Sequence, residues 1–103
     1  MTEPVVSVIM PAYNCRDVIG QAIASVLLQD VPLELIIIDD ASSDELETLV
    51  EQYADERIRY VRNPSNLGVA QSRNRGVSLA KGRYIAFLDA DDWWAPDKLK
   101  KQL

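Results

Sequence analysis

The 103-residue sequence contains no histidine and only one cysteine, Cys15. These absences exclude an internal disulfide and a cysteine-rich zinc site, and they remove the usual histidine-base chemistry. No G-x-G-x-x-G follows the first apolar run, and no G-K-[ST] occurs in the chain. Their absence weighs against nicotinamide or flavin enzymes and against the P-loop nucleoside triphosphatases.

Basic surfaces and long apolar segments are also missing. The net charge of −5 argues against binding to nucleic acid or to an anionic membrane. The first apolar run, residues 5–10, is too short for a signal peptide or a membrane span, so a cytoplasmic protein is expected. The length suits one small domain over residues 1–103. Residues 96–103 resemble a helix that has only begun, so we expect a C-terminally truncated part of a longer protein.

Apolar runs alternate with segments of helical periodicity. Strands are predicted at residues 5–10, 33–38, 58–61 and 83–88, with Pro11 ending the first and residues 84–88 buried. Helices are predicted over residues 16–28, after a capping box from Ser42 to Glu45, and over residues 69–80, with Gly82 as the residue after the helix end. The pattern predicts a Rossmann-like three-layer α/β/α fold with a mainly parallel four-stranded sheet.

In such a sheet the carboxyl ends of all strands meet at one edge, where ligands bind. Four loops fall there, at residues 11–14, 39–43, 63–68 and 89–92. They bring a tyrosine, asparagines, aspartates and a glycine turn together from distant parts of the chain. This convergence is the main argument from the residues for a binding site.

The acidic loop after the last strand has two interpretations. Asp89 and Asp91 could both face one Mg²⁺ or Mn²⁺, which prefer oxygen ligands shared with phosphates. Alternatively the loop is merely solvated, with Asp92 capping a turn. Of Asp39 and Asp40, one is expected to accept hydrogen bonds from a base or ribose and the other to support the next helix.

The remaining polar and aromatic candidates each have a plain structural alternative. Tyr13 offers a face for stacking a base or for ordinary packing, and Asn14 is an alternative helix cap. Arg73 is placed to reach the site, whereas Arg75 is expected to be a solvated surface residue. At most one of Trp93 and Trp94 is expected at the site, and Cys15 is expected to pack rather than to react.

Four ordered motifs resemble the start of the family-two glycosyltransferases, which are inverting enzymes of the GT-A fold. The motifs occupy residues 6–14, 38–44, 66–76 and 82–92 together with Pro96. They follow the family's order and cover almost the whole chain. Ala12 stands where the family often has Thr or Ser, and Ala41 where it often has Gly or Asn; neither departure removes a candidate ligand.

The resemblance implies a nucleotide-diphosphate sugar donor, most often a UDP-sugar, with Mn²⁺ or Mg²⁺ as cofactor. Tyr13 would stack on the base, Asp40 would accept from its N–H, and Asp39 would support that loop. In the DxD motif, Asp91 would be the direct metal ligand and Asp89 would lie by the ribose and metal. The nucleotide-binding residues expected in full are Pro11, Tyr13, Asn14, Asp39, Asp40, Asn66, Gly68, Arg73, Asp89 and Ala90.

The resemblance also sets the limits of the expectation. The family's catalytic base and acceptor site come from later sequence, so we assign no base up to Leu103 and expect no sugar transfer by this part alone. The acceptor, an unknown saccharide or lipid, would belong to cell-envelope polysaccharide biosynthesis, at the inner face of the membrane in a longer protein. The alternatives are a metal-dependent nucleotidyltransferase and a non-catalytic nucleotide-binding or self-associating module that forms a homodimer.

Overall fold

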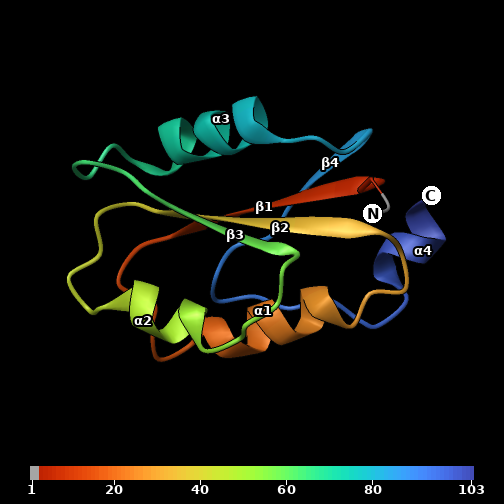
Figure 1. Cartoon of the computed structure of the whole chain (residues 1–103), viewed down its shortest axis with the longest axis horizontal. Coiled ribbons are helices and arrows are strands. Elements are labelled where there is room, and N and C mark those ends of the chain that lie inside the picture. The colour runs from red at the N-terminus through yellow and green to blue at the C-terminus, as the bar shows by residue number, and fades with distance from the viewer. Residues whose placement is uncertain (1–2) are drawn as a thin grey trace.

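The computed structural model describes residues 3–103. Strands and helices alternate along this part of the chain, as the apolar pattern predicts (Figure 1). In order, the elements are β1 (Val6–Ala12), α1 (Ile19–Leu27), β2 (Leu33–Asp39), α2 (Leu46–Glu51), β3 (Ile58–Arg62), α3 (Val69–Leu79), β4 (Tyr84–Phe87) and α4 (Lys98–Gln102).

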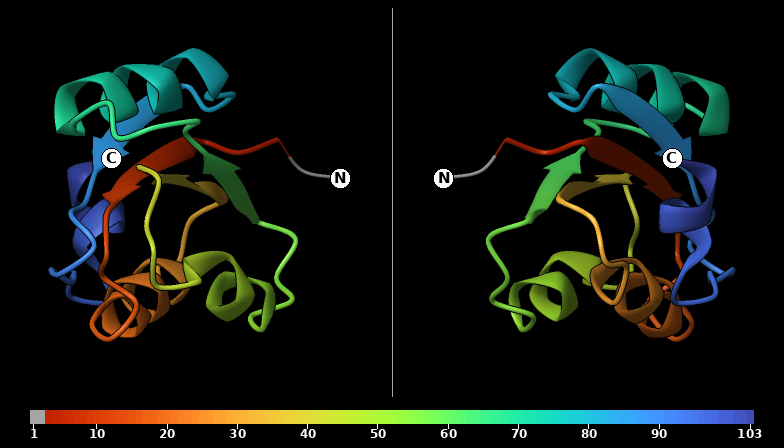
Figure 2. Two further views of the ribbon diagram at one scale, coloured as in Figure 1. Left: turned by 90° about the vertical axis from the view of Figure 1, so that its left-hand side faces the viewer. Right: turned by 90° about the vertical axis from the view of Figure 1, so that its right-hand side faces the viewer.

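The strands form one sheet in the order β3-β2-β1-β4, and every pair is parallel. Helix α3 covers one face of the sheet, while α1 and α2 cover the other (Figure 2). The predicted three-layer α/β fold with a four-stranded parallel sheet is therefore confirmed. Because β4 joins on the far side of β1 from β2, the strand order reverses beside β1, which is where ligands of such sheets bind.

The continuous apolar run of β2 serves both faces of the sheet. Leu35 and Ile37 belong to the core under α1 and α2, whereas Ile36 and Ile38 pack with Ile9 on the α3 side. Since successive side chains of a strand point to opposite faces, only a strand buried on both sides needs such an unbroken run. The core thus places β1 and β2 at the centre, and their carboxyl ends form the rigid floor of the site.

Pro11 lies within β1, so the prediction that it ends the strand is wrong. The carbonyl of Ala12 accepts a hydrogen bond from Asp40 N on the β2 side, and that of Ile9 accepts one from Leu88 N on the β4 side. Backbone groups alternate sides along a strand, so Pro11 turns its nitrogen toward β4. Since β4 pairs with β1 only as far as Ile9, no strand is left there to need the missing N–H.

Helices α1 and α2 begin later than predicted, and neither has a side-chain cap. Asn14 does not cap α1, because its Oδ1 accepts a hydrogen bond from Ser43 N at 2.9 Å. The prediction of a capping box from Ser42 to Glu45 is also wrong. Ser42 Oγ accepts from Asn14 N at 2.9 Å, and Glu45 has a left-handed backbone with φ of 59° before α2 starts. These polar side chains join loops across the sheet edge instead of capping their own helices.

Helix α3 ends at Leu79 with an extended Ala80, so the prediction of Gly82 as a left-handed residue after the helix is wrong. Gly82 serves close packing instead. A Cβ at this position would lie 2.7 Å from both the backbone nitrogen and Oγ of Ser7. Gly82 N donates to that same Oγ at 2.8 Å, which holds the turn before β4 against β1.

The expectation that residues 84–88 form a buried strand is also wrong for most of them. Tyr84, Ile85 and Phe87 are exposed, while Leu88 is buried. The contacts of helix α3 with the sheet are concentrated on β1 and β2, and most side chains of the edge strand β4 stay exposed. An apolar run predicts a strand, but it does not tell whether the neighbouring layers extend far enough to bury it.

Candidate functional site

Two adjoining cavities lie at the carboxyl edge of the sheet, with volumes of about 280 and 550 Å³. They share Pro11, Tyr13 and Val69, so they form a single groove along the ends of β1 and its neighbours. The first cavity is lined by Pro11, Ala12, Tyr13, Asp40, Asn66, Gly68, Val69 and Ser72. The second is lined by Pro11, Tyr13, Asn14, Cys15, Val18, Val69, Arg73, Asp89, Ala90 and Asp91.

The groove brings together all of the predicted site residues except Asp39, which lines neither cavity. It also contains residues that the sequence did not single out, among them Val69 and Ser72. Both belong to the first turn of α3. Because helical residues four apart share a face, the position of Arg73 gave some signal for Val69, whereas nothing in the sequence indicated Ser72.

Tyr13 occupies the middle of the groove. Its side chain is 54% exposed, although it directly follows a buried strand. The next residue, Asn14, has a positive φ of 47°, and it bonds to Ser42 and Ser43 of the neighbouring loop. The chain therefore turns sharply after β1, which leaves the flat ring of Tyr13 accessible from solvent.

Asp40 is only 5% exposed, and its carboxylate organises the loop before α3. Oδ1 accepts hydrogen bonds from Asn63 Nδ2 at 2.9 Å and Leu67 N at 2.7 Å, and Oδ2 accepts one from Gly68 N at 2.9 Å. Burial alone would raise the pKa of Asp40, but these hydrogen bonds outweigh it and hold the pKa below its ordinary value. Gly68 has a φ of 93°, a conformation that glycine adopts without strain and that turns its N–H toward Asp40.

Asp39 is fully buried beneath the groove and acts on the loop rather than in the cavity. One carboxylate oxygen accepts a hydrogen bond from Ser42 N at 2.8 Å. The other accepts from the Tyr60 hydroxyl and pairs with Arg62 at 3.1 Å. Burial, and next the hydrogen bond to Asp39, raise the pKa of Tyr60, so its hydroxyl stays a donor. In this structure Asp39 thus supports the Ser42 loop.

Asn63 is a buried residue that contacts Asp40 from behind the groove, and sequence reasoning missed this role. Its Nδ2 donates to Asp40 Oδ1 and to Ser72 Oγ, at 2.9 and 3.0 Å, and its Oδ1 accepts from Arg75 Nη1 at 2.7 Å. The expectation that Arg75 is a solvated surface residue is therefore wrong, since the guanidinium also reaches the carbonyl of Arg62. An asparagine before a proline suggests a turn, and this ordinary interpretation concealed its role.

The acidic loop after β4 is open to solvent. Asp89 pairs with Arg73 Nη2 at 3.1 Å, with its side chain 59% exposed, and Asp91 is exposed as well. Asp92 closes a turn through its N–H to the Asp89 carbonyl, and its own carboxylate accepts from Trp93 N. Within residues 3–103, no three acidic or cysteine side chains gather closely enough to form a complete metal cage. The loop offers two exposed carboxylates, one of them paired with Arg73, rather than a finished metal site.

Arg73 links this loop to the groove. Its guanidinium lies 5.9 Å from the ring centroid of Phe87, and it lines the cavity beside Asp89 and Asp91. Among the described residues, Arg73 Nε is buried without any hydrogen-bond acceptor. Buried donors are normally satisfied, whereas Arg73 keeps one donor without a partner in residues 3–103, in a side chain that lines the cavity.

One of the two adjacent tryptophans is buried and the other is exposed, as the alternation of side chains in an extended segment predicts. Trp94 is 8% exposed and belongs to the main core, whereas Trp93 is 57% exposed. Both tryptophans line a third cavity of about 510 Å³, which shares Arg73 and Asp89 with the groove. Trp93 is far more exposed than Trp94, so it is the better candidate to face a ligand near the acidic loop.

Cys15 lies half-buried at the wall of the second cavity. Burial, and next the charge of Asp44, raise the pKa of its thiol to about 11. A thiolate is needed for nucleophilic attack or metal binding. At neutral pH Cys15 is therefore a protonated, unreactive packing residue, as predicted.

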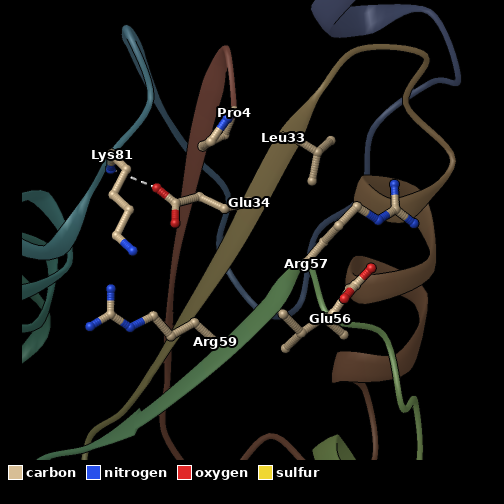
Figure 3. Close-up of a pocket in the computed structure, with 8 residues that line it drawn as sticks. Pro4, Leu33, Glu34, Glu56, Arg57, Arg59 and Lys81 are labelled. Carbon is tan, nitrogen blue, oxygen red and sulfur yellow. Dashed lines mark hydrogen bonds between the residues drawn. The ribbon is translucent and has the colours of Figure 1, made fainter. Parts of the chain in front are cut away.

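A further cavity of about 510 Å³ lies at the opposite edge of the sheet, beside the start of the strands (Figure 3). Two of its charged groups have partners within the fold. Glu34 accepts from Ser7 Oγ and from Lys81 N, both at 2.6 Å, and Arg57 pairs with Asp55 at 2.8 Å. The contacts of Glu34 fasten the turn before β4 to β1 and β2, so we assign them a structural role.

Among helices of residues 3–103, none has both the length and the apolar character needed to cross a bilayer. The parallel sheet, and the groove of aromatic, amide and carboxylate groups at its carboxyl edge, define the class: an α/β protein with a candidate nucleotide site. Residues 7–103 match the family described as Glycosyl transferase family 2. The chain belongs to this family.

Relatives among curated proteins carry names from polysaccharide assembly. TuaG of Bacillus subtilis (strain 168), a glycosyltransferase named for teichuronic acid biosynthesis, is 50% identical over 98% of this chain and 41% of its own length. WfaP of Escherichia coli, named UDP-Glc:alpha-D-GlcNAc-diphosphoundecaprenol beta-1,3-glucosyltransferase, is 42% identical over 95% of this chain and 39% of its own length. The chain thus spans about two fifths of the length of these relatives.

Solved structures of similar proteins contain nucleotide sugars. S. aureus TarS 1-349 in complex with UDP-GlcNAc aligns with a TM-score of 0.88 and 30% identity, covering 94% of this chain and 29% of that one. The mannosyltransferase PcManGT from Pyrobaculum calidifontis, in complex with GDP-Man and Mn²⁺, aligns with a TM-score of 0.86 and 30% identity. That alignment covers 96% of this chain and 31% of the mannosyltransferase.

Proposed function

We propose that this chain is the donor-nucleotide half of an inverting glycosyltransferase that uses a nucleotide-diphosphate sugar and a divalent metal. The observation that carries the proposal is the continuous groove from Asp40, past Tyr13, to Asp89 and Asp91. A base, a ribose and a diphosphate are joined in that order in the ligand. The groove offers its groups in a matching order: the acceptor Asp40 at one end, the ring face of Tyr13 in the middle, and the carboxylates of Asp89 and Asp91 at the other end.

The base would lie at the Asp40 end. Tyr13 is exposed and can stack on a flat base, and Asp40 lines the same cavity as an ionised acceptor. The lowered pKa of Asp40 keeps it ionised at neutral pH. Because its three internal donors leave a single acceptor position free, one base N–H fits better than two. Uracil presents one such N–H, whereas guanine presents an adjacent pair, so we propose a UDP-sugar.

The diphosphate and metal would lie at the other end. Asp91, with Asp89 beside it, supplies the hard oxygen ligands that Mn²⁺ and Mg²⁺ share with phosphates, so the donor set fits such an ion. When bound, the metal would offset the negative charge that develops on the leaving diphosphate. Arg73, with its unsatisfied Nε–H, is suited to donate to a phosphate or ribose oxygen on the same wall.

The wider role is drawn from the relatives. TarS is solved with UDP-GlcNAc, and WfaP is named for transfer to a diphosphoundecaprenol-linked sugar. We propose that the acceptor is a saccharide or lipid-linked saccharide of the cell envelope, reached from the cytoplasmic face of the membrane. Residues 1–103 would form the nucleotide-sugar-binding domain, and the catalytic base and the acceptor site would come from sequence beyond Leu103. The chain alone is then expected to bind donor without transferring sugar.

Calorimetric titration with UDP tests the donor site. Binding is expected with Mn²⁺ present and is expected to disappear with a chelator. Asp91→Ala should abolish the metal-dependent binding, whereas Asp92→Ala, an equally exposed neighbour whose carboxylate serves the local turn, should keep it. Failure of UDP, GDP, CDP and ADP to bind the wild type would contradict the proposal, as would equal losses in the two variants.

A second candidate, self-association, is favoured by the uncovered edge strand. β4 has no strand on its outer side in the described sheet, and Tyr84, Ile85 and Phe87 are exposed on it. Unpaired backbone groups beside apolar side chains promote pairing with another chain. Gel filtration should then show a concentration-dependent homodimer that Ile85→Lys dissociates. A monomer at all concentrations would exclude this candidate.

A further inference from the structure

Asn63 connects the candidate base pocket to the rest of the fold from a position that no solvent reaches. It is 1% exposed, and every polar group of its side chain has a partner. Both N–H groups of Nδ2 are used, one by Asp40 Oδ1 and the other by Ser72 Oγ. The amide oxygen accepts from Arg75 Nη1 at 2.7 Å.

These partners fix the orientation of the amide. A carboxylate can only accept and a guanidinium can only donate, so exchanging the oxygen and nitrogen of Asn63 would bring like groups together at both ends. Its backbone N–H is also fixed, since it donates to the carbonyl of Asp39 at 2.8 Å. Asn63 therefore presents its N–H to Asp40 in one direction only.

The contact determines what Asp40 has left to offer. An ionised carboxylate has about four acceptor positions, two on each oxygen. Asn63 and Leu67 occupy both positions of Oδ1, and Gly68 occupies one on Oδ2. One position on Oδ2 remains for a ligand in the cavity that Asp40 lines.

We propose that Asn63 is a positioning residue that makes the pocket select a base with a ring N–H at its pairing edge. The proposal rests on the proposed function, because it assumes that the base lies beside Asp40. Uracil meets the free position of Oδ2 with its N3–H. Cytosine has the same size and shape, but its N3 presents a lone pair, which a carboxylate held in this direction repels. Without Asn63, one acceptor position on Oδ1 is freed and only the backbone N–H groups of Leu67 and Gly68 hold the carboxylate, so its direction is less fixed and the distinction is weakened.

Calorimetric titration with UDP and with CDP, both with Mn²⁺, tests the proposal. These ligands differ only at the edge of the base, so their affinity ratio isolates base selection from diphosphate and metal binding. We expect the wild type to prefer UDP by at least about tenfold, the discrimination of one well-placed hydrogen bond to a charged group. In Asn63→Ala the UDP affinity should fall several-fold while the CDP affinity changes by less than about twofold. The ratio of UDP to CDP affinity therefore moves closer to one.

Two further substitutions separate positioning from general destabilisation. Ser25→Ala removes a buried hydroxyl that donates to the Ala22 carbonyl in α1, on the opposite face of the sheet. It should leave the ratio of UDP to CDP affinity unchanged. Arg75→Ala removes the donor that holds the amide oxygen of Asn63, so it should lower the ratio of UDP to CDP affinity, but less than Asn63→Ala does. Arg75→Lys keeps a donor and should restore the wild-type ratio. The Arg75 pair also decides the question if Asn63→Ala does not fold.

The outcomes are distinct. Equal affinities of UDP and CDP in the wild type would overturn the inference and leave the proposed function standing. Equal losses for the two ligands in Asn63→Ala would also overturn it, because they would show a structural role alone. If neither UDP nor CDP binds the wild type, the inference fails; the proposed function fails with it only if GDP and ADP do not bind either.

Discussion

Two pairs of aspartates lie at the carboxyl edge of the same sheet, and they are built in opposite ways. Asp39 and Asp40 follow the central strand β2, are 0% and 5% exposed, and accept hydrogen bonds from five other residues besides the Arg62 ion pair. Asp89 and Asp91 follow the edge strand β4 and are exposed, with one ion pair to Arg73 between them.

The difference follows from the place of each strand in the sheet. At the end of a central strand a carboxylate is surrounded by loops whose N–H groups need acceptors, so the charge is stabilised by hydrogen bonds and shapes those loops. At the end of an edge strand no such loops surround it, and the carboxylate remains free for a ligand. The first pair therefore builds the site, whereas the second pair is available to bind a cation.

The largest expected effect is the loss of stability in Asp39→Ala. The substitution leaves Arg62, Tyr60 and the Ser42 N–H without their buried partner. We expect the free energy of unfolding to fall by about 3 kcal/mol, the cost of breaking a buried charged network. Urea denaturation measures it, with Asp91→Ala as the matched exposed control, expected within about 0.5 kcal/mol of wild type. Similar losses in both variants would remove the distinction between the pairs.

The next effect concerns the ion pair between Arg73 and Asp89. The side chains are 40% and 59% exposed, so solvent screens the pair and Arg73→Met should lower the free energy of unfolding by less than about 1 kcal/mol. The same substitution should weaken metal-dependent UDP binding by about tenfold, because a charge-assisted hydrogen bond to the ligand is lost. Calorimetry measures the loss of UDP affinity, and urea denaturation of the same preparation measures the loss of stability. A large stability loss with unchanged UDP affinity would place Arg73 among the structural residues.

A pH effect distinguishes Asp40 in particular. Its pKa is lower in the folded protein than the ordinary value, since hydrogen bonds from Leu67, Asn63 and Gly68 overcome the effect of burial. The resulting stabilisation is complete above the unfolded pKa of about 3.9 and is lost as the pH falls through the lower folded pKa. Between about pH 5 and pH 3, the wild type should therefore lose stability more steeply than Asp40→Asn. Parallel pH profiles in urea denaturation would contradict this assignment.

The fold and most of the groove could be predicted because they depend on local patterns. Apolar runs mark the strands, and parallel topology alone brings Tyr13, Asp40 and Asp91 to one edge. What could not be predicted depends on partners distant in sequence. Nothing near Asn63 indicates that it will meet Asp40 and Arg75, and nothing in Pro11 indicates that β4 ends before it needs a donor. The same limit applies to the capping box, because Ser42 bonds to Asn14 from another loop.

A further prediction concerns Cys15 in the wall of the groove. Because its thiol pKa is raised to about 11, little thiolate is present near neutral pH. Alkylation by iodoacetamide at about pH 8 should be on the order of a hundredfold slower than in the urea-unfolded chain. Bound UDP and Mn²⁺ should slow it further by covering the groove. Rapid alkylation of the folded chain would show that the thiol is more exposed or more acidic than its surroundings indicate.

The most direct test of the central claim is line broadening by Mn²⁺ in the amide spectrum of the chain with UDP bound. Mn²⁺ broadens the signals of nuclei near it, so the position of the ion can be read residue by residue. The account predicts loss of the amide signals of residues 89–92 first, while Glu34, Arg59 and Lys81 at the opposite edge keep theirs. Broadening centred on the opposite edge, or no selective broadening anywhere, would contradict the proposal that Asp89 and Asp91 are the open, metal-binding pair.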